Sequence, residues 1–211
     1  MADVLLLHHA QGQTPGFLAF ADALRAAGHT VHTPDLYGGE SFATLDEGMA
    51  KARSIGFDRL QEQGVAAAEG LPDDLVYAGF SLGVMAAQRL AQTRPGARGA
   101  VLLDSAIPLG EFAPSWPAGV PVQVHGGEAD EFFMDEGDVD AARAIVAAAA
   151  HGELFTYPGC GHLFADASTT AYDPEAAGLV QQRVLDFIAR LQADAARRRD
   201  RSRVRLPRHP A

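Results

Sequence analysis

A serine between two glycines is the first residue of the sequence that could carry out chemistry. An apolar, β-prone run starting at Leu75 leads into Gly79-Phe80-Ser81-Leu82-Gly83, and a run of helix formers, 84–91, follows it. A strand, a sharp turn and a helix in this order hold a serine hydroxyl at an exposed tip, where it can act as a nucleophile. The start of the helix offers N–H groups to a developing oxyanion. The alternative is a structural turn serine, because glycine and serine are common in turns.

A serine nucleophile needs a base, and the base needs an acid that orients it. After a strand–turn–helix serine, the acid comes next along the chain and the histidine last. Asp130 ends the loop Gly126-Gly127-Glu128-Ala129-Asp130, and His162 ends the glycine turn Pro158-Gly159-Cys160-Gly161-His162. We therefore predict that His162 is the base and Asp130 its acid, with Glu128 as the competing acid. In the alternative interpretation His162 is an ordinary loop histidine.

Two backbone N–H groups are needed to hold the oxyanion. We predict that Leu82, directly after the nucleophile, donates one, and that Ala10, in the turn after the first predicted strand, donates the other. His8 and His9 could instead bind a metal, but adjacent residues at a strand end point in opposite directions and rarely ligate one ion. We expect neither a metal nor a cofactor.

Strands that alternate with helices must position these groups. Helical patterns include 57–69, 138–150 and a final helix from Asp173 to about Ala195. The pattern of 41–55 is ambiguous and fits either a loop or a short helix inside a loop. This alternation predicts an α/β fold with a doubly wound, mostly parallel sheet. Loops that bind ligands then gather at the carboxyl ends of the strands. Six strands are predicted, at 3–8, 29–33, from 75 to the turn at Ser81, and at 100–103, 120–124 and 153–157.

Length and composition describe one ordinary globular domain. The chain has 211 residues, of which 47% are hydrophobic and 21% charged. We assign 1–195 to a single domain. No apolar run is long enough to span a bilayer, and the N-terminus lacks the basic start and cleavage site of a signal peptide. We therefore expect a cytoplasmic protein with no membrane partner. The single cysteine, Cys160, excludes an internal disulfide framework.

The charge is unevenly distributed. Residues 197–211 carry seven Arg and one Asp, or +6, so a total of −10 leaves −16 on the remainder. The acidic body argues against nucleic acid as the main partner. We predict that 196–211 form a basic, disordered tail; the alternative is a segment that binds an anionic surface. The oligomeric state stays open.

Five segments spread along nearly the whole chain form a recognisable set of motifs. They are Pro34-Asp35-Leu36-Tyr37, the Ser81 turn, the Asp130 loop, 158–164 and 171–177. With these motifs the chain resembles the dienelactone hydrolase family. The two C-terminal motifs are the more specific, since the serine turn marks only the wider α/β-hydrolase superfamily. The resemblance implies a compact, lidless α/β-hydrolase fold and attack on esters or lactones through a covalent acyl-enzyme.

The chain departs from the family at three positions. The family's founding enzymes have a cysteine nucleophile, where this chain has Ser81. They have a glutamate in the first loop, where His9 stands, and an arginine four residues after the histidine, where Asp166 stands. We expect His9, Tyr37 and Asp166 to lie in the substrate pocket. Because Asp166 would repel a substrate carboxylate, we predict a preference for neutral substrates.

The resulting prediction is a serine hydrolase with a Ser81–His162–Asp130 triad. Its substrate would be a small carboxylic ester, lactone or thioester. Two alternatives stay open: a non-catalytic protein that binds a small ligand on the same scaffold, and an acyltransferase that passes the acyl group to an acceptor other than water.

Overall fold

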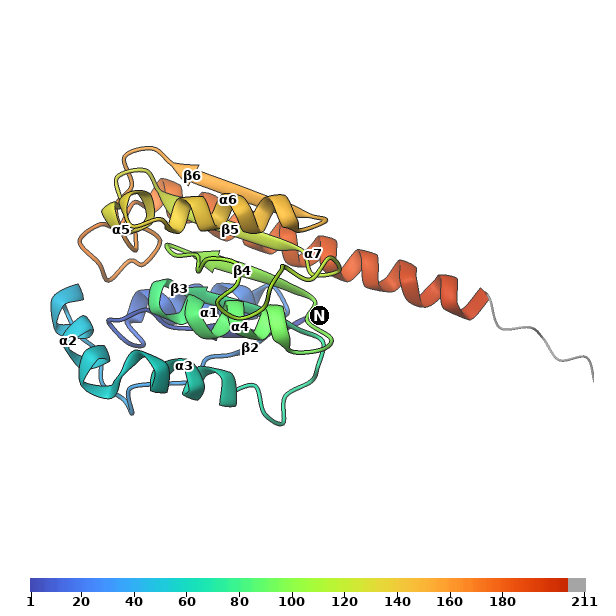
Figure 1. Ribbon diagram of the computed structural model, residues 1–211, viewed down its shortest axis with the longest axis horizontal. Helices are drawn as coiled ribbons and strands as arrows, with labels where there is room; N and C mark the ends of the chain where they lie inside the picture. Colours follow the sequence, from blue (N-terminus) through green and yellow to red (C-terminus); the bar gives the residue numbers. More distant parts are fainter. Residues whose placement is uncertain (205–211) are drawn as a thin grey trace, which may run out of the picture.

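The computed structural model describes the backbone of residues 1–204 and the side chains of residues 1–197. Its centre is a six-stranded sheet in the order β2-β1-β3-β4-β5-β6. All five neighbouring pairs are parallel, which confirms the predicted doubly wound α/β fold (Figure 1). The strands are β1 (Asp3–Leu7), β2 (Thr30–His32), β3 (Leu75–Phe80), β4 (Gly99–Leu103), β5 (Val122–Gly127) and β6 (Gly152–Tyr157).

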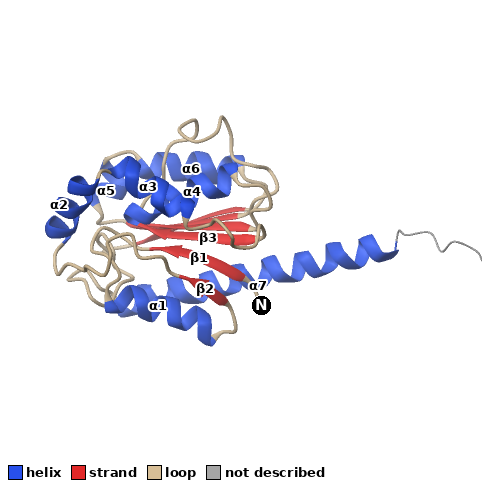
Figure 2. Cartoon of the chain, turned by 90° about the horizontal axis from the view of Figure 1, so that it is seen from below, coloured by secondary structure: helices blue, strands red, loops and turns tan. Residues whose placement is uncertain are grey.

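Helices cover both faces of the sheet. Alternate strand residues point to opposite faces, so Val4 and Leu6 pack on one side and Leu5 and Leu7 on the other. Burial on both faces explains why the inner strands β1, β3 and β4 are continuous apolar runs rather than alternating ones. Figure 2 shows α1 (Pro15–Ala26) and α7 (Pro174–Val204) on one face, with α3 (Phe57–Ala66), α4 (Val84–Thr93) and α6 (Asp138–Ala148) on the other.

Two short helices and one turn lie at the carboxyl ends of the strands. The ambiguous stretch 41–55 contains a true helix, α2 (Leu45–Ile55), which begins with a capping box formed by Thr44 and Glu47. The turn η1 (Ser81–Gly83) follows β3, and α5 (Glu131–Asp135) follows β5. Figure 1 shows α2 and α5 at the same end of the molecule. Binding loops were predicted at this edge.

The final helix is longer than predicted. It was expected to end near Ala195, yet α7 continues to Val204, so the disorder predicted from residue 196 is wrong for 196–204. Alanine and arginine are good helix formers, and no glycine or proline occurs between Gly178 and Pro207. Among the side chains of α7 that the structure describes, which end at Arg197, Leu191 is the last one buried in the core. The rest of the predicted tail, 205–211, lies outside the described residues. Within 1–204, no helix is both long and apolar enough to cross a membrane.

Candidate active site

Ser81 stands at a strained turn directly after β3. Its φ of 46° lies in the left-handed region that non-glycine residues seldom adopt. Gly79 permits the turn, because a Cβ at that position would lie 2.5 Å from the carbonyl oxygen of Gly83. The local structure therefore has the strand, tight turn and helix that the sequence predicts, with the serine at the tip.

The structure brings Ser81, His162 and Asp130 together from three separate loops. Ser81 Oγ lies 2.9 Å from His162 Nε2, and His162 Nδ1 lies 2.7 Å from Asp130 Oδ2. Asp130 is 1% exposed, and its other oxygen accepts a hydrogen bond from Phe132 N–H at 3.0 Å. With Nδ1–H donating to the carboxylate, Nε2 is free to accept the serine proton.

The environment of His162 favours its protonated form. Burial alone would lower the pKa of His162, but the hydrogen bond to Asp130 and the negative charges of Asp104, Asp130 and Asp138 outweigh burial and raise it. His162 must lose this proton before it can act as a base. Any activity that uses His162 as a base is thus lost as the pH falls through its raised pKa.

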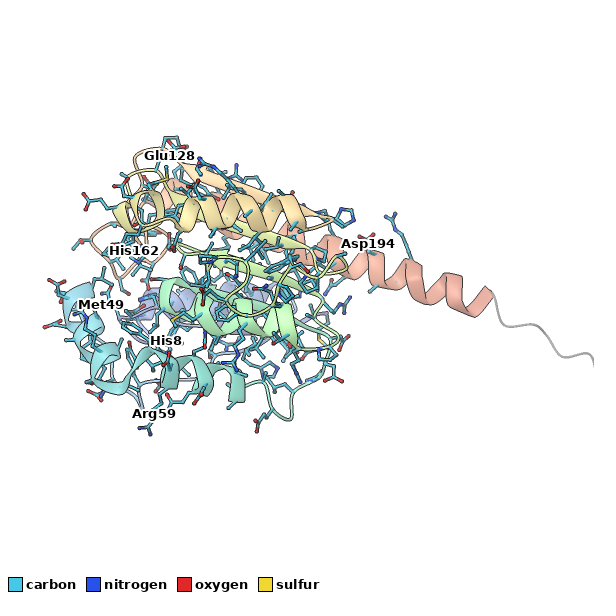
Figure 3. All side chains as sticks on the ribbon, in the orientation of Figure 1. His8, Met49, Arg59, Glu128, His162 and Asp194 are labelled. Carbon is cyan, nitrogen blue, oxygen red and sulfur yellow. The ribbon has the colours of Figure 1, made fainter. Side chains whose placement is uncertain are left out.

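Glu128, the competing acid, is engaged elsewhere. Its Oε1 accepts a hydrogen bond from Thr156 Oγ1 at 2.7 Å on an exposed surface. Figure 3 shows Glu128 well away from His162. The geometry therefore favours Asp130 as the partner of His162.

The two N–H groups predicted for the oxyanion lie on segments that touch. A Cβ on Gly83 would lie 2.4 Å from Leu7 O, so the turn after Ser81 packs against the end of β1. Ala10 is fully buried in the loop that follows β1, where Gly12 N–H donates to His9 O at 3.0 Å. Within the described residues, no hydrogen bond from Ala10 N–H is formed. Leu82 lines the cavity beside Ser81.

The prediction that His9, Tyr37 and Asp166 lie in the substrate pocket is wrong. None of the three lines the cavity beside Ser81 and His162. His9 Nε2–H donates to Asp166 Oδ2 at 2.7 Å, and both side chains are fully buried. Tyr37 is 4% exposed, and its hydroxyl donates to Gly48 O at 3.4 Å. All three hold the loop after β1 and its neighbours in place.

Asp166 is a negatively charged residue that accepts hydrogen bonds from His9 and Thr14. Burial alone would raise the pKa of Asp166, but hydrogen bonds from His9 and Thr14 outweigh burial and lower it. Thr14 is also the N-cap of α1 and accepts a bond from Phe17 N–H. Asp166 thus ties the loop before α1, which contains Ala10, to the loop after His162.

A cavity of about 200 Å³ opens beside Ser81 and His162. Its walls are mainly apolar, with Leu45 and Met49 contributed by α2, which the sequence left ambiguous. Among the described residues that line it, three are acidic, and none is a lysine or arginine. The lining residues are Leu45, Met49, Phe57, Ser81, Leu82, Met85, Asp104, Ser105, Ile107, Phe132, Glu136, Asp138 and His162.

The sequence matches the family model of the dienelactone hydrolase family over residues 2–192. The chain belongs to this family. Membership supports hydrolase activity, and it confirms the resemblance drawn from the motifs. Among proteins with curated functions, none matches the chain.

Solved structures of other proteins share the fold. One is the dienelactone hydrolase-like promiscuous phosphotriesterase P91 from metagenomic libraries, at 18% identity and a TM-score of 0.71, covering 90% of this chain and 87% of that one. Another is esterase 2 of Thermogutta terrifontis, at 18% identity and a TM-score of 0.57, covering 90% of this chain and 83% of that one. At these identities the likeness shows the common fold.

Sequence reasoning missed one residue of this dienelactone hydrolase-family site. Asp104 follows β4 directly and lines the cavity, but no motif marks it. Its position at the end of a predicted strand was the available signal, since that is where the other site residues were found.

Proposed function

We propose that this chain is a serine hydrolase that cleaves a small carboxylic ester, lactone or thioester through an acyl-enzyme. One observation carries the proposal: Ser81 Oγ, His162 and Asp130 form a continuous chain of hydrogen bonds at the edge of a cavity. Family membership supports the same reaction class. The cavity of about 200 Å³ suits a small acyl or alcohol group.

The reaction begins when Ser81 Oγ attacks the substrate carbonyl carbon and its proton passes to His162 Nε2. Asp130 stabilises the imidazolium that forms. The Leu82 and Ala10 N–H groups hold the oxyanion until the intermediate collapses. The departing alcohol takes the proton from His162, which leaves Ser81 acylated. Water, deprotonated by His162, then releases the acid and restores Ser81.

Labelling with a fluorophosphonate tests the proposal directly. We expect one stable adduct, located on Ser81 by mass spectrometry, together with turnover of short-chain aryl esters. Thermogutta terrifontis esterase 2, a protein of the same fold, has been solved in a form phosphorylated by paraoxon. If the folded chain is neither labelled nor active, a protein that only binds a small ligand is the better account. Ester products formed with added alcohols or amines would instead identify an acyltransferase.

Neutral substrates are expected to react faster than anionic ones. The earlier reason, a carboxylate of Asp166 in the pocket, does not hold, but Asp104, Glu136 and Asp138 line the cavity instead. A substrate carboxylate meets these acids with no lysine or arginine among the described lining residues to pair with it. We expect kcat/KM to be at least about tenfold lower, or about 1.4 kcal/mol, for a lactone with a free carboxylate than for its methyl ester at fixed ionic strength. Faster turnover of the anionic lactone would contradict this account.

Asp166→Asn is expected to slow catalysis without direct contact with the substrate. The change weakens the bond to His9 Nε2–H and loosens the loop that carries Ala10 N–H. Losing a buried charged hydrogen bond costs about 1–3 kcal/mol, so we expect kcat to fall about tenfold to hundredfold, with a smaller change in KM. Steady-state kinetics and thermal melting measure both effects. Asp22→Asn is the control, because Asp22 forms an exposed ion pair with Arg25 on α1. It should change neither the kinetic constants nor the melting temperature.

A further inference from the structure

Asp104 lies beside Ser81 at the carboxyl edge of the sheet. In the pairing of β3 with β4, Phe80 is opposite Leu103. Ser81 and Asp104 are the residues that directly follow these two strand ends. Both enter the left-handed region, with φ of 46° and 59°, and Leu163, next to His162, has φ of 62°. Among the described residues these are the three non-glycine positions with positive φ. Backbone strain of this kind costs free energy and often marks functional sites.

The described part of the chain leaves the carboxyl group of Asp104 without a well-formed hydrogen bond. The residue is 1% exposed, and neither side-chain oxygen contacts solvent or accepts a hydrogen bond of normal geometry, although Leu163 N–H approaches it. A structural aspartate in a protein interior is normally satisfied by N–H or O–H donors. Asp104 therefore differs from Asp166, whose oxygens are bonded to His9, Thr14 and Ser168.

Among the described residues, His162 supplies the positive charge that offsets the burial of Asp104. Burial raises the pKa of Asp104 to about 7, and the positive charge of His162 opposes that rise. Asp104 in turn raises the pKa of His162. Each group thus alters the protonation of the other, while Asp130 already occupies His162 Nδ1.

We propose that Asp104 is a second positioning residue for His162, acting on the imidazole through space while Asp130 holds it through a hydrogen bond. The proposal rests on the proposed function, because it assigns His162 the role of base. Ionised Asp104 stabilises the imidazolium that forms when Ser81 gives up its proton. The same charge makes His162 harder to deprotonate at rest, so it moves the onset of activity to higher pH. At pH values above the pKa of Asp104 its carboxyl group is ionised, so both effects on His162 are fully present.

The sealed position of Asp104 argues against direct substrate binding. Asp104 is among the residues that line the cavity, but neither of its side-chain oxygens is exposed to solvent, so its charge acts on groups in the cavity without a hydrogen bond to them. Other ionisable groups also act on this pair and must be kept constant in a test. The groups facing His162 or Asp104 are Asp130, Asp138, Asp166, Tyr157 and Cys160.

Titration of His162 by NMR tests the proposal without relying on turnover. In the full chain carrying Ser81→Ala, the His162 imidazole signals are followed against pH with and without Asp104→Asn. Removing a negative charge close to the imidazole should lower the pKa of His162 by about one unit. Glu128→Gln, which removes an exposed carboxylate bonded to Thr156, is the matched control and should leave that pKa unchanged. An unchanged His162 pKa in Asp104→Asn overturns the proposal.

The pH dependence of kcat/KM for a neutral aryl ester gives the second readout. With Ser81 intact, Asp104→Asn should move the acid limb to lower pH by about the same one unit, because His162 deprotonates more easily. A merely structural role would lower the rate at every pH and leave the limb in place. Asp104→Gly removes the same charge but relieves the positive φ, so it should give the same shift and guards against a folding artefact.

The two readouts separate this inference from the proposed function. If the wild type is labelled and active but neither the NMR pKa nor the acid limb moves, the role of Asp104 is wrong and the hydrolase stands. If the wild type is neither labelled nor active, the proposed function fails, and with it the role given to Asp104, even if the two groups interact.

Discussion

Ser81→Ala is expected to lower kcat for ester hydrolysis by roughly six orders of magnitude, as in enzymes whose serine acts as one unit with its base. The hydroxyl supplies the atom that attacks the carbonyl, and no other serine of residues 1–197 forms a hydrogen bond with His162. The fold should be little affected, because the Ser81 hydroxyl bonds only to His162 among the described side chains, and Ser81 is only partly buried. Thermal melting should therefore shift by only a few degrees.

Ester turnover, fluorophosphonate labelling and melting measured on the same samples decide this prediction. Ser54→Ala serves as the control, since Ser54 is exposed on α2 and its hydroxyl donates to Lys51 O. The control should keep full turnover and full labelling. Substantial turnover in folded Ser81→Ala would remove Ser81 from the mechanism.

Asp130→Asn is expected to lower kcat roughly ten-thousand-fold, by analogy with other serine triads. The amide keeps the shape of the carboxylate but can donate to His162 Nδ1, which favours the tautomer whose Nε2 already carries a proton. It also removes the charge that stabilises the imidazolium. KM should change much less, because Asp130 does not line the cavity.

Glu128→Gln is the matched control for this second prediction. It removes a carboxylate two residues away that bonds Thr156 rather than His162. Its kcat should stay within about threefold of the wild-type value, since altered surface charges commonly contribute less than 1 kcal/mol. If Glu128→Gln is inactive and Asp130→Asn is active, the acid has been assigned to the wrong residue.

The sequence was sufficient to predict the site residues that directly follow the ends of strands. Ser81, Asp130 and His162 each follow an apolar strand, and parallel strands end at one edge, so their meeting could be predicted. Most of the six strands could be predicted because they are short apolar runs, whereas the edge strands β2 (Thr30–His32) and β6 (Gly152–Tyr157) are of more mixed composition. The choice between Asp130 and Glu128 rested on spacing, and the geometry now favours Asp130.

Side-chain direction was the part that the sequence could not provide. Asp166 and His9 were expected in the pocket from their alignment with the family, but they face each other in the interior. Which way a loop residue points depends on contacts between distant segments, and these two are 157 residues apart in the sequence. Asp104 was missed because its meaning comes from cross-strand register and burial, and neither can be read along the chain.

The projecting end of α7 makes this protein suited to oriented attachment. Beyond Leu191 the helix continues to Val204, a rise of about 20 Å at 1.5 Å per residue. Figure 3 shows Asp194 at the opposite end of the molecule from His162, and Figures 1 and 2 show the helix leaving the body there. A surface, bead or fused domain joined after Val204 would stand clear of the cavity mouth, which would open toward the surrounding solution.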